Sequence, residues 1–396
     1  MDATGKVFRR HVLYIPGYDP FPPRRYRELY RKEGTAQAAI SGYALAIQPR
    51  KGETYGWRVT SRMEHPAEAE VEVLVWADIV RGSMERGVFG TFVLLARTAW
   101  VYGASGALWH LVRLRKGPMI AALYPAVLLL VQGLVALATG WLVLRILALP
   151  FGLDWLLAAA AVFAVLEGFR RMDRRLFVYY LMHDYAFTAV EGGAYPAALV
   201  ARLADFRGRV RNALGLAVDE VLIVGHSSGA HLAVSVLADL IREGVPADGP
   251  ALGFLSLGQA VPMASFLPRA SKLRGDLRFL SQRNEVTWVD VTAPGDGCSF
   301  ALCDPVGVSG VATEGQLWPL VISAAFTRTL SPERWRELRR RFFRLHFQYL
   351  CAFDRPGDYD YFRITAGPMT LADRFRGRKP SASRITAPFS PCRDVT

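Results

Sequence analysis

The chain has few cysteines and no recognisable nucleic-acid-binding module. Its 396 residues include four cysteines, all in the last quarter, which form no ligand set with histidines. We therefore expect free thiols in a reducing compartment, and we predict neither a metal site nor a cofactor. Zinc-finger spacings, RNP-like aromatic motifs and lysine-rich stripes are missing, so no nucleic-acid partner is expected. Residues 1–11 are charged and contain no apolar stretch, which argues against a cleavable signal peptide.

Apolar residues and positive charge are both abundant. Hydrophobic residues make up 52% of the sequence, and the formal net charge is +13. A basic excess suits either a nucleic acid or an anionic membrane surface as the partner. Because arginines flank the apolar runs, the composition favours a membrane.

The longest apolar run covers residues 119–144 and contains no charged residue. As a helix it would be about 39 Å long at ~1.5 Å per residue, which exceeds the ~30 Å hydrocarbon core of a bilayer. A turn at Pro150, Gly152 and Asp154 separates it from a shorter apolar segment. We predict transmembrane helices over about 119–144 and 150–169. A re-entrant hairpin, or a buried apolar lid in a soluble enzyme, are the alternatives.

Basic residues cluster at both outer ends of this hairpin, namely Arg113, Arg115, Lys116, Arg170, Arg171, Arg174 and Arg175. Only Arg145 and Asp154 mark the turn between the two helices. The positive-inside rule then places both outer ends in the cytoplasm. We therefore expect a protein of the cytoplasmic (inner) membrane whose soluble part faces the cytoplasm.

Strand and helix patterns alternate on both sides of the hairpin. Short apolar strands are predicted at 11–15, 55–60, 69–76, 221–225, 252–257 and 286–291. This alternation predicts an α/β fold, in which a mostly parallel sheet carries helices on both faces. We divide the chain into two parts of one core (1–86 and 177–372), an inserted membrane-associated segment (87–176) and a disordered basic tail (373–396).

A short motif follows the strand predicted at 221–225. Gly225-His226-Ser227-Ser228-Gly229 matches the pattern G-x-S-x-G, and a helical pattern begins directly after it. Such a strand–turn–helix elbow holds its central residue in a strained backbone conformation, and the two glycines leave room for it. The helix N-terminus directs free N–H groups toward the place where an oxyanion would form. Ser227, the central residue, is the candidate nucleophile.

The segment from Gly225 to Leu232 resembles the nucleophile segment of the α/β-hydrolase superfamily, in particular of its serine esterases, lipases and amidases. By motif, the resemblance covers this segment and the early Pro16-Gly17 loop. By the order of elements, it covers most of the chain outside the hairpin. It implies an α/β-hydrolase-like fold and a Ser-acid-His triad in that chain order. The insertion departs from the family pattern, because it precedes the nucleophile strand.

The resemblance also implies an oxyanion hole built from two backbone N–H groups. Ser228, the residue after the nucleophile, would supply one of them. The other would come from the loop after the first strand, where we choose Tyr18, because the preceding Gly17 lets a substrate approach closely. This loop lacks the HGGG-type run found in many lipases.

The same chain order places the acid and the base after the nucleophile helix. His346 is the one histidine beyond that helix, and it would be the base if the order holds; a histidine packed in an aromatic cluster is the alternative. Asp296 lies between two glycines in the loop after the strand at 286–291 and is the first candidate for the acid. Asp304 and Asp290 remain open as alternatives.

These residues predict a membrane-anchored serine hydrolase that cleaves an ester, thioester or amide through an acyl-enzyme. His346 would remove the Ser227 proton as the hydroxyl attacks a carbonyl, and an aspartate would orient the imidazole. The location suggests a lipid or other acyl compound as the small-molecule substrate. An acyltransferase with the same acyl-enzyme is one alternative. A catalytically silent hydrolase fold, acting as a membrane-bound interaction module, is the other.

Overall fold

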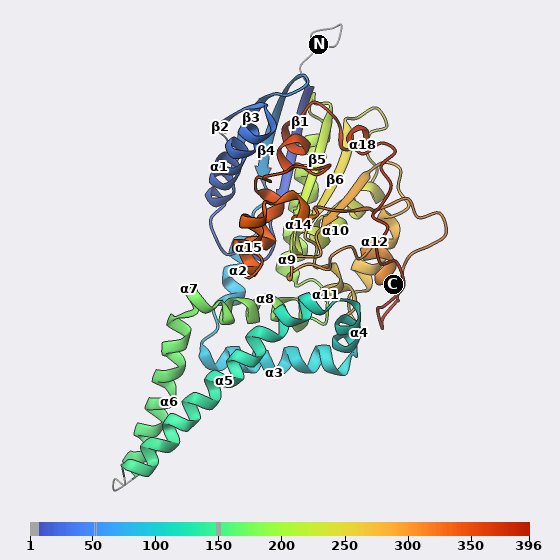
Figure 1. Cartoon of the computed structure of the whole chain (residues 1–396). Helices are drawn as coiled ribbons and strands as arrows, with labels where there is room; N and C mark the ends of the chain where they lie inside the picture. Colours follow the sequence, from blue (N-terminus) through green and yellow to red (C-terminus); the bar gives the residue numbers. More distant parts are fainter. Residues whose placement is uncertain (1–7, 51, 53, 148–151) are drawn as a thin grey trace.

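A single sheet organises the computed structural model, which describes residues 8–50, 52, 54–147 and 152–396 (Figure 1). The strand order in this sheet is β2-β3-β4-β1-β5-β6-β7-β8. The strands are β1 (Phe8–Ile15), β2 (Ala44–Pro49), β3 (Gly56–Arg62), β4 (Pro66–Val73), β5 (Glu220–His226), β6 (Ala251–Leu257), β7 (Thr287–Thr292) and β8 (Leu320–Ser323).

The sheet is mostly parallel. Strand β1 pairs in parallel with β4 on one side and with β5 on the other, and parallel pairing continues through β6 and β7 to β8. Only the pairs β2–β3 and β3–β4 are antiparallel. The predicted α/β class is therefore confirmed. Our sequence prediction omitted the edge strands β2 and β8; β8 has only four residues, and most of β2 is exposed, so neither leaves a strong apolar signal.

Helices lie in the connections other than β2–β3 and β3–β4, and further helices follow β8. They are α1 (Arg24–Ser41), α2 (Ala77–Met84), α3 (Val88–Ala104), α4 (Ala107–Leu114), α5 (Lys116–Ile146), α6 (Leu153–Arg171), α7 (Asp173–Leu176), α8 (Val178–Val190), α9 (Ala197–Leu214), α10 (Ser228–Arg242), α11 (Val261–Ser265), α12 (Ser271–Leu280), α13 (Pro305–Val308), α14 (Phe326–Thr329), α15 (Pro332–Leu338), α16 (Phe342–His346), the 3-10 helix η2 (Phe347–Leu350), α17 (Tyr361–Ala366) and α18 (Leu371–Arg374).

The two faces of the sheet carry separate apolar cores, as the period-two alternation of strand side chains requires. On β1, Val12 and Tyr14 pack in one cluster with side chains of α1 and α17. The intervening Leu13 and Ile15 pack in the other cluster, with α9, α10 and α12. Helices therefore cover both faces, as expected. Four strands precede residues 87–176 and four follow them, so the sheet joins both flanks of that segment.

Helices α5 and α6 pack along each other and project away from the sheet (Figure 1). Within the described residues, α5 is the one helix that is long and apolar enough to cross a membrane by itself. Only 22% of its most apolar stretch is buried, which is unlike a core helix of a soluble protein. Helices α2 and α3 pass the same test only as a pair, and the pair is bent by 103°.

The second predicted span, 150–169, corresponds in part to α6; residues 150 and 151 lie outside the described part of the chain. Helix α6 does not qualify as a span by itself. Its 19 residues include Asp154 near one end and Glu167, Arg170 and Arg171 near the other. These charges leave too short an apolar stretch between them.

The tail differs from the disorder that we expected from its composition. Ile385 forms an isolated parallel bridge with Cys303, and the Phe389 N–H donates to the Val308 carbonyl oxygen. Asp394 accepts a hydrogen bond of 2.7 Å from the buried guanidinium of Arg274. These contacts supply the order that a polar, arginine-rich segment cannot generate alone, because its partners lie on the folded core.

Candidate active site

The turn between β5 and α10 places Ser227 in an unusual backbone conformation. Its φ is 56° and its ψ is −122°, although it is not a glycine. Such conformations cost on the order of 1–3 kcal/mol and are retained where the surrounding structure enforces them. A Cβ atom at Gly229 would lie 2.2 Å from the Ile15 carbonyl oxygen, and one at Gly225 would lie 2.7 Å from the Gly229 carbonyl oxygen. The elbow thus needs both glycines, as the motif predicted.

Two backbone N–H groups beside Ser227 are free to bind a ligand. Neither the Ser228 N–H nor the Tyr18 N–H donates a hydrogen bond to another residue in the described part of the chain. Ser228 is the first residue of α10, so its N–H carries the positive end of the helix dipole. A Cβ atom at Gly17 would lie 3.0 Å from the Ser227 Cβ, which shows how closely the loop after β1 approaches the serine.

Side chains from distant segments hold this loop in place. The Trp76 indole N–H donates to the Pro16 carbonyl oxygen over 2.9 Å. The Tyr180 hydroxyl donates to the Tyr18 carbonyl oxygen, and the Tyr18 hydroxyl lies 2.6 Å from the Ser83 hydroxyl. With its carbonyl oxygen and its ring both fixed, Tyr18 keeps its backbone N–H in one orientation.

His346 and Asp296 form a buried hydrogen-bonded pair. The His346 Nδ1 lies 2.8 Å from the Asp296 Oδ2, and their side chains are 8% and 0% exposed. Burial raises the pKa of Asp296, but the neighbouring His346 and the hydrogen bonds it receives outweigh burial, so the pKa lies below its usual value. The carboxyl group is therefore ionised and accepts from Nδ1–H. In the neutral imidazole, this bond keeps the proton on Nδ1, and Nε2 then offers a free lone pair.

Two further groups hold the Asp296 carboxylate. The Tyr349 hydroxyl donates to Oδ2 over 3.0 Å, and the Cys298 backbone N–H donates to Oδ1 over 2.9 Å. The Tyr349 oxygen in turn accepts from the Ala293 N–H over 2.9 Å. The carboxylate is thus fixed from three sides, so its orientation toward His346 is determined by the protein.

The structure assigns other roles to the two alternative acids. Asp304 caps α13 by accepting from the Val306 and Gly307 N–H groups, and it also accepts from the Gln316 side chain. Asp290 lies fully buried on β7 and accepts a 2.6 Å hydrogen bond from the Ser256 hydroxyl. Neither contacts His346, so Asp296 alone among the three candidates is placed to orient that histidine.

Ser227 and His346 line the same cavity without being hydrogen bonded to each other. The His346 Nε2 is buried and has no hydrogen-bond partner among the described residues. Leaving such a nitrogen unpaired costs about 1–3 kcal/mol, so its environment is suited to a ligand or a moving side chain. Unliganded enzymes often show long or misaligned catalytic hydrogen bonds, which shorten once the substrate is bound.

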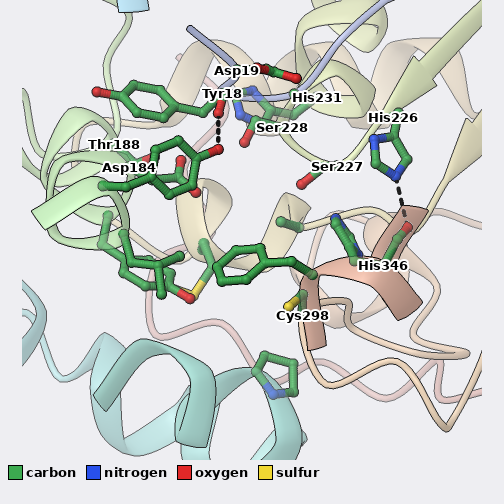
Figure 2. A pocket seen from close by; sticks show the side chains of 18 of the residues that line it. Tyr18, Asp19, Asp184, Thr188, His226, Ser227, Ser228, His231, Cys298 and His346 are labelled. Carbon is green, nitrogen blue, oxygen red and sulfur yellow. Dashed lines mark hydrogen bonds between the residues drawn. The ribbon is translucent and has the colours of Figure 1, made fainter. Parts of the chain in front are cut away.

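The cavity has a volume of about 80 Å³, several times the ~10–15 Å³ that one water molecule needs. Figure 2 shows Ser227, Ser228, His346 and Cys298 around it, with Asp184 on the side opposite His346. Its aromatic lining is supplied by Tyr18, Tyr26, Tyr180, Tyr185, Phe343 and Phe347. A small polar group could therefore reach the serine while apolar parts of a ligand contact the rings.

Sequence reasoning missed three residues that shape this site. His226 Nε2 lies 3.1 Å from the His346 carbonyl oxygen, and because a carbonyl only accepts, Nε2 carries the proton. This bond ties the elbow to the end of α16, which carries His346. Tyr349 anchors Asp296, and Asp184 faces the cavity. Tyr349 follows His346 by three residues, and this spacing of about one helical turn could have indicated from the sequence that the two side chains lie close together. No sequence pattern could have indicated the contact between His226 and His346.

Asp296, Cys298 and His346 are the residues of metal-ligand type that lie together in the described part of the chain, with ligand atoms within 4.8 Å of one another. The carboxylate oxygens already accept three hydrogen bonds, and burial raises the pKa of the Cys298 thiol well above its usual value. A metal needs the thiolate and would have to replace the His346–Asp296 bond. The arrangement is better suited to proton transfer.

Comparison of the chain with protein-family models, with curated proteins and with solved structures finds no match in any of the three. The α/β class therefore rests on the strand order and pairing described above. Any functional assignment rests on the geometry around Ser227.

Proposed function

We propose that this protein is a membrane-anchored serine hydrolase with an α/β-hydrolase-like core. The observation that carries the proposal is the convergence of three segments on one cavity: the strained Ser227 elbow, the loop that holds Asp296 and reaches the cavity through Cys298, and helix α16, which ends at His346. A nucleophile, a base and an acid that orients the base make up the constellation of serine hydrolases. No metal or organic cofactor enters this mechanism.

The first step is attack of the Ser227 Oγ on an ester, thioester or amide carbonyl. The His346 Nε2 accepts the hydroxyl proton, and Asp296 stabilises the imidazolium that forms. Collapse of the tetrahedral intermediate breaks the bond to the leaving group, which takes the proton from Nε2. A water molecule then attacks the acyl-enzyme through the same histidine, and it releases the acid and the free serine.

The Ser228 and Tyr18 N–H groups are placed to bind the oxyanion of each intermediate. They are unpaired, and they belong to segments that other side chains hold rigidly, so they need little reorganisation during the reaction. Removing one such donor from a serine hydrolase typically lowers kcat by about a hundredfold to a thousandfold. The strained backbone of Ser227 is the condition for placing its hydroxyl beside these donors.

A larger groove beside the cavity supports a lipid or acyl substrate. It has a volume of about 1110 Å³ and shares Asp19, Tyr180, Phe343 and Phe347 with the cavity. Its wall includes Arg170 and Arg171, at the end of α6 where the hairpin joins the core. With α5 in a bilayer, the groove would lie close to the membrane surface, and an acyl chain would reach Ser227 along an apolar wall.

A serine-directed fluorophosphonate probe tests the enzymatic assignment. We expect the full-length protein in detergent to be labelled, and Ser227→Ala to abolish labelling because the attacking oxygen is gone. Ser228→Ala is the matched control: its backbone N–H remains, so labelling should persist. Undiminished labelling of Ser227→Ala, or no labelling of the wild-type protein, would overturn the proposal.

The missing Ser227–His346 hydrogen bond favours one second candidate, a silent hydrolase fold that serves as a membrane-bound interaction module. Cells carrying Ser227→Ala or His346→Ala discriminate between the two. A wild-type phenotype in both variants supports the interaction module, whereas loss of function at normal protein levels supports the enzyme.

A further inference from the structure

Asp184 is an acidic side chain of the cavity for which the proposed mechanism has no use. It lies in α8, within the helix that leads back from the hairpin, and it lines the cavity together with Ser227 and His346 (Figure 2). Its carboxyl group is half-buried and makes no hydrogen bond or ion pair within the described part of the chain. An ionised carboxyl group in such a place has lost part of its hydration, and a bound cation would compensate for that loss.

Asp19, the other acidic residue that lines the cavity, differs from Asp184 because its carboxyl group has hydrogen-bond partners. Asp19 accepts from the Tyr26 hydroxyl over 2.6 Å and from the Phe21 N–H over 2.9 Å, and it pairs with Arg25 over 3.3 Å. These three partners satisfy Asp19, whereas Asp184 has none. The two residues are therefore not equivalent, and only Asp184 has its oxygens available to a ligand.

Among the described residues that line the cavity, His346 offsets the charge of Asp184 only in part. The described lining residues include neither lysine nor arginine. Burial lowers the pKa of His226 to about 3 and that of His231 to about 4, so both are neutral at pH 7. The ionisable groups that interact with Asp184 are His346, Tyr18, Tyr102, Tyr180, Tyr185 and Cys298.

The surroundings of Asp184 suit a cation. Burial raises the pKa of the four tyrosines and of Cys298, so these groups carry no charge at neutral pH. Tyr180 and Tyr185 line the cavity with it, and aromatic faces attract ammonium groups through their quadrupoles. A carboxylate combined with aromatic rings therefore provides both a charge and a surface for a positively charged nitrogen.

From this arrangement we propose that Asp184 determines specificity by binding a positively charged nitrogen of the substrate, next to the bond that Ser227 attacks. The inference rests on the proposed hydrolase function and names its substrate class: esters, thioesters or amides that carry an ammonium group. The cation enters the cavity, while an apolar chain of the substrate lies in the adjoining groove. Asp184 takes no part in bond making or breaking; it selects the substrate.

Matched ester pairs test this role in the full-length protein. In one pair, a choline ester is compared with its neutral carbon isostere, in which a tert-butyl group replaces the trimethylammonium group. In the second pair, a nitrophenyl ester whose acyl group carries a trimethylammonium group is compared with the nitrophenyl ester that carries a tert-butyl group in its place. We expect the wild-type kcat/KM to favour the charged member of at least one pair by about tenfold or more, as a partly desolvated ion pair does.

The variants Asp184→Asn and Asp184→Glu separate charge from structure. Asp184→Asn should bring the ratio of the two kcat/KM values close to one, because kcat/KM falls more for the charged ester than for the neutral ester. Asp184→Glu should retain the preference for the charged ester. Burial raises the pKa of Asp184 to about 7, partly opposed by His346. The preference should therefore decline as the pH falls through 7, because the carboxyl group becomes neutral. The ratio of the two rates cancels any pH effect that is common to both esters.

Three results would overturn the inference: no preference in the wild-type protein, an unchanged preference in Asp184→Asn, or an equal loss on both esters in that variant. The last result would assign Asp184 to the chemistry or to the fold. Failure of the proposed function is recognised separately, because then no ester is cleaved and no Ser227-dependent probe labelling occurs. Should Asp184→Asn fail to fold, the preference of Asp184→Glu and its pH dependence still decide the outcome.

Discussion

His346 Nδ1 and Asp296 Oδ2 lie 2.8 Å apart, although 50 residues separate them in the chain. The loop after β7 supplies the acid and α16 supplies the histidine, and Tyr349 secures the carboxylate from the next turn. Because Nδ1 is occupied, the imidazole presents Nε2 to the cavity. In the proposed mechanism this relationship sets the direction of proton transfer, and it is the basis of the first prediction.

Replacement of Asp296 by asparagine should lower kcat by about ten-thousandfold, because the amide neither holds the required imidazole tautomer nor stabilises the imidazolium. The measurement is ester hydrolysis at neutral pH, with thermal unfolding as a check on folding. Asp304→Asn is the control: asparagine caps a helix about as well as aspartate, so the variant should keep the α13 cap and leave kcat nearly unchanged. Equal losses in the two variants would contradict the assignment of the acid.

The elbow glycines should be sensitive to a single methyl group. Gly229→Ala places a Cβ 2.2 Å from the Ile15 carbonyl oxygen, so we expect a loss of stability of about 1–3 kcal/mol and a loss of probe labelling. Gly208→Ala, in the middle of α9, meets nothing within 4 Å and should stabilise the protein by about 0.5–1 kcal/mol. A Gly229→Ala protein as stable and as reactive as the wild type would show that the turn is not constrained as described.

Asp290 should make the protein less stable as the pH rises. Burial raises the pKa of Asp290 to about 8, whereas an unfolded aspartate titrates near ~3.9. Between these values the folded state holds a proton that the unfolded state has lost. This one group therefore lowers the free energy of unfolding by roughly 1.4 kcal/mol per pH unit across that window.

Asp290→Asn removes this titration and keeps an acceptor for the Ser256 hydroxyl. Between pH 5 and pH 8, the free energy of unfolding of the variant should rise relative to that of the wild type by on the order of 1 kcal/mol per pH unit. Thermal unfolding in detergent at several pH values measures it. Parallel pH profiles of the two proteins would show that Asp290 is not held neutral.

The hairpin should be responsible for membrane binding. Leu134 and Leu137 are exposed by 67% and 63% on α5, and an aspartate at the centre of a span costs about 2.5–3.5 kcal/mol. The double substitution Leu134→Asp and Leu137→Asp should move the protein from the membrane to the soluble fraction, or abolish its flotation with anionic vesicles. Leu216→Asp, which alters an exposed leucine of the core domain, should have no such effect. Unchanged flotation of the double variant would exclude α5 as the anchor.

Several features of this protein follow from local sequence alone. The apolar run before Gly225, the two glycines of the elbow and the helical pattern after them predict the strand, the strained turn and the helix around Ser227, because these depend on neighbours along the chain. The uncharged run within α5 predicts a long exposed apolar helix for the same reason. The order of elements indicated His346 as the candidate base and favoured Asp296 as the candidate acid, but Asp304 and Asp290 remained as alternatives for the acid.

Only the tertiary structure decided among those candidates, because they differ in what lies near them across the sheet. Asp304 meets the start of α13, Asp290 meets Ser256 on β6, and Asp296 alone meets His346. The unpaired carboxyl group of Asp184 is likewise invisible in the sequence, since being unpaired is a property of its surroundings. Local pattern thus determined the turn around Ser227, whereas long-range packing determined which side chains lie near it, because hydrogen bonds between distant segments have no periodic signature in a single chain.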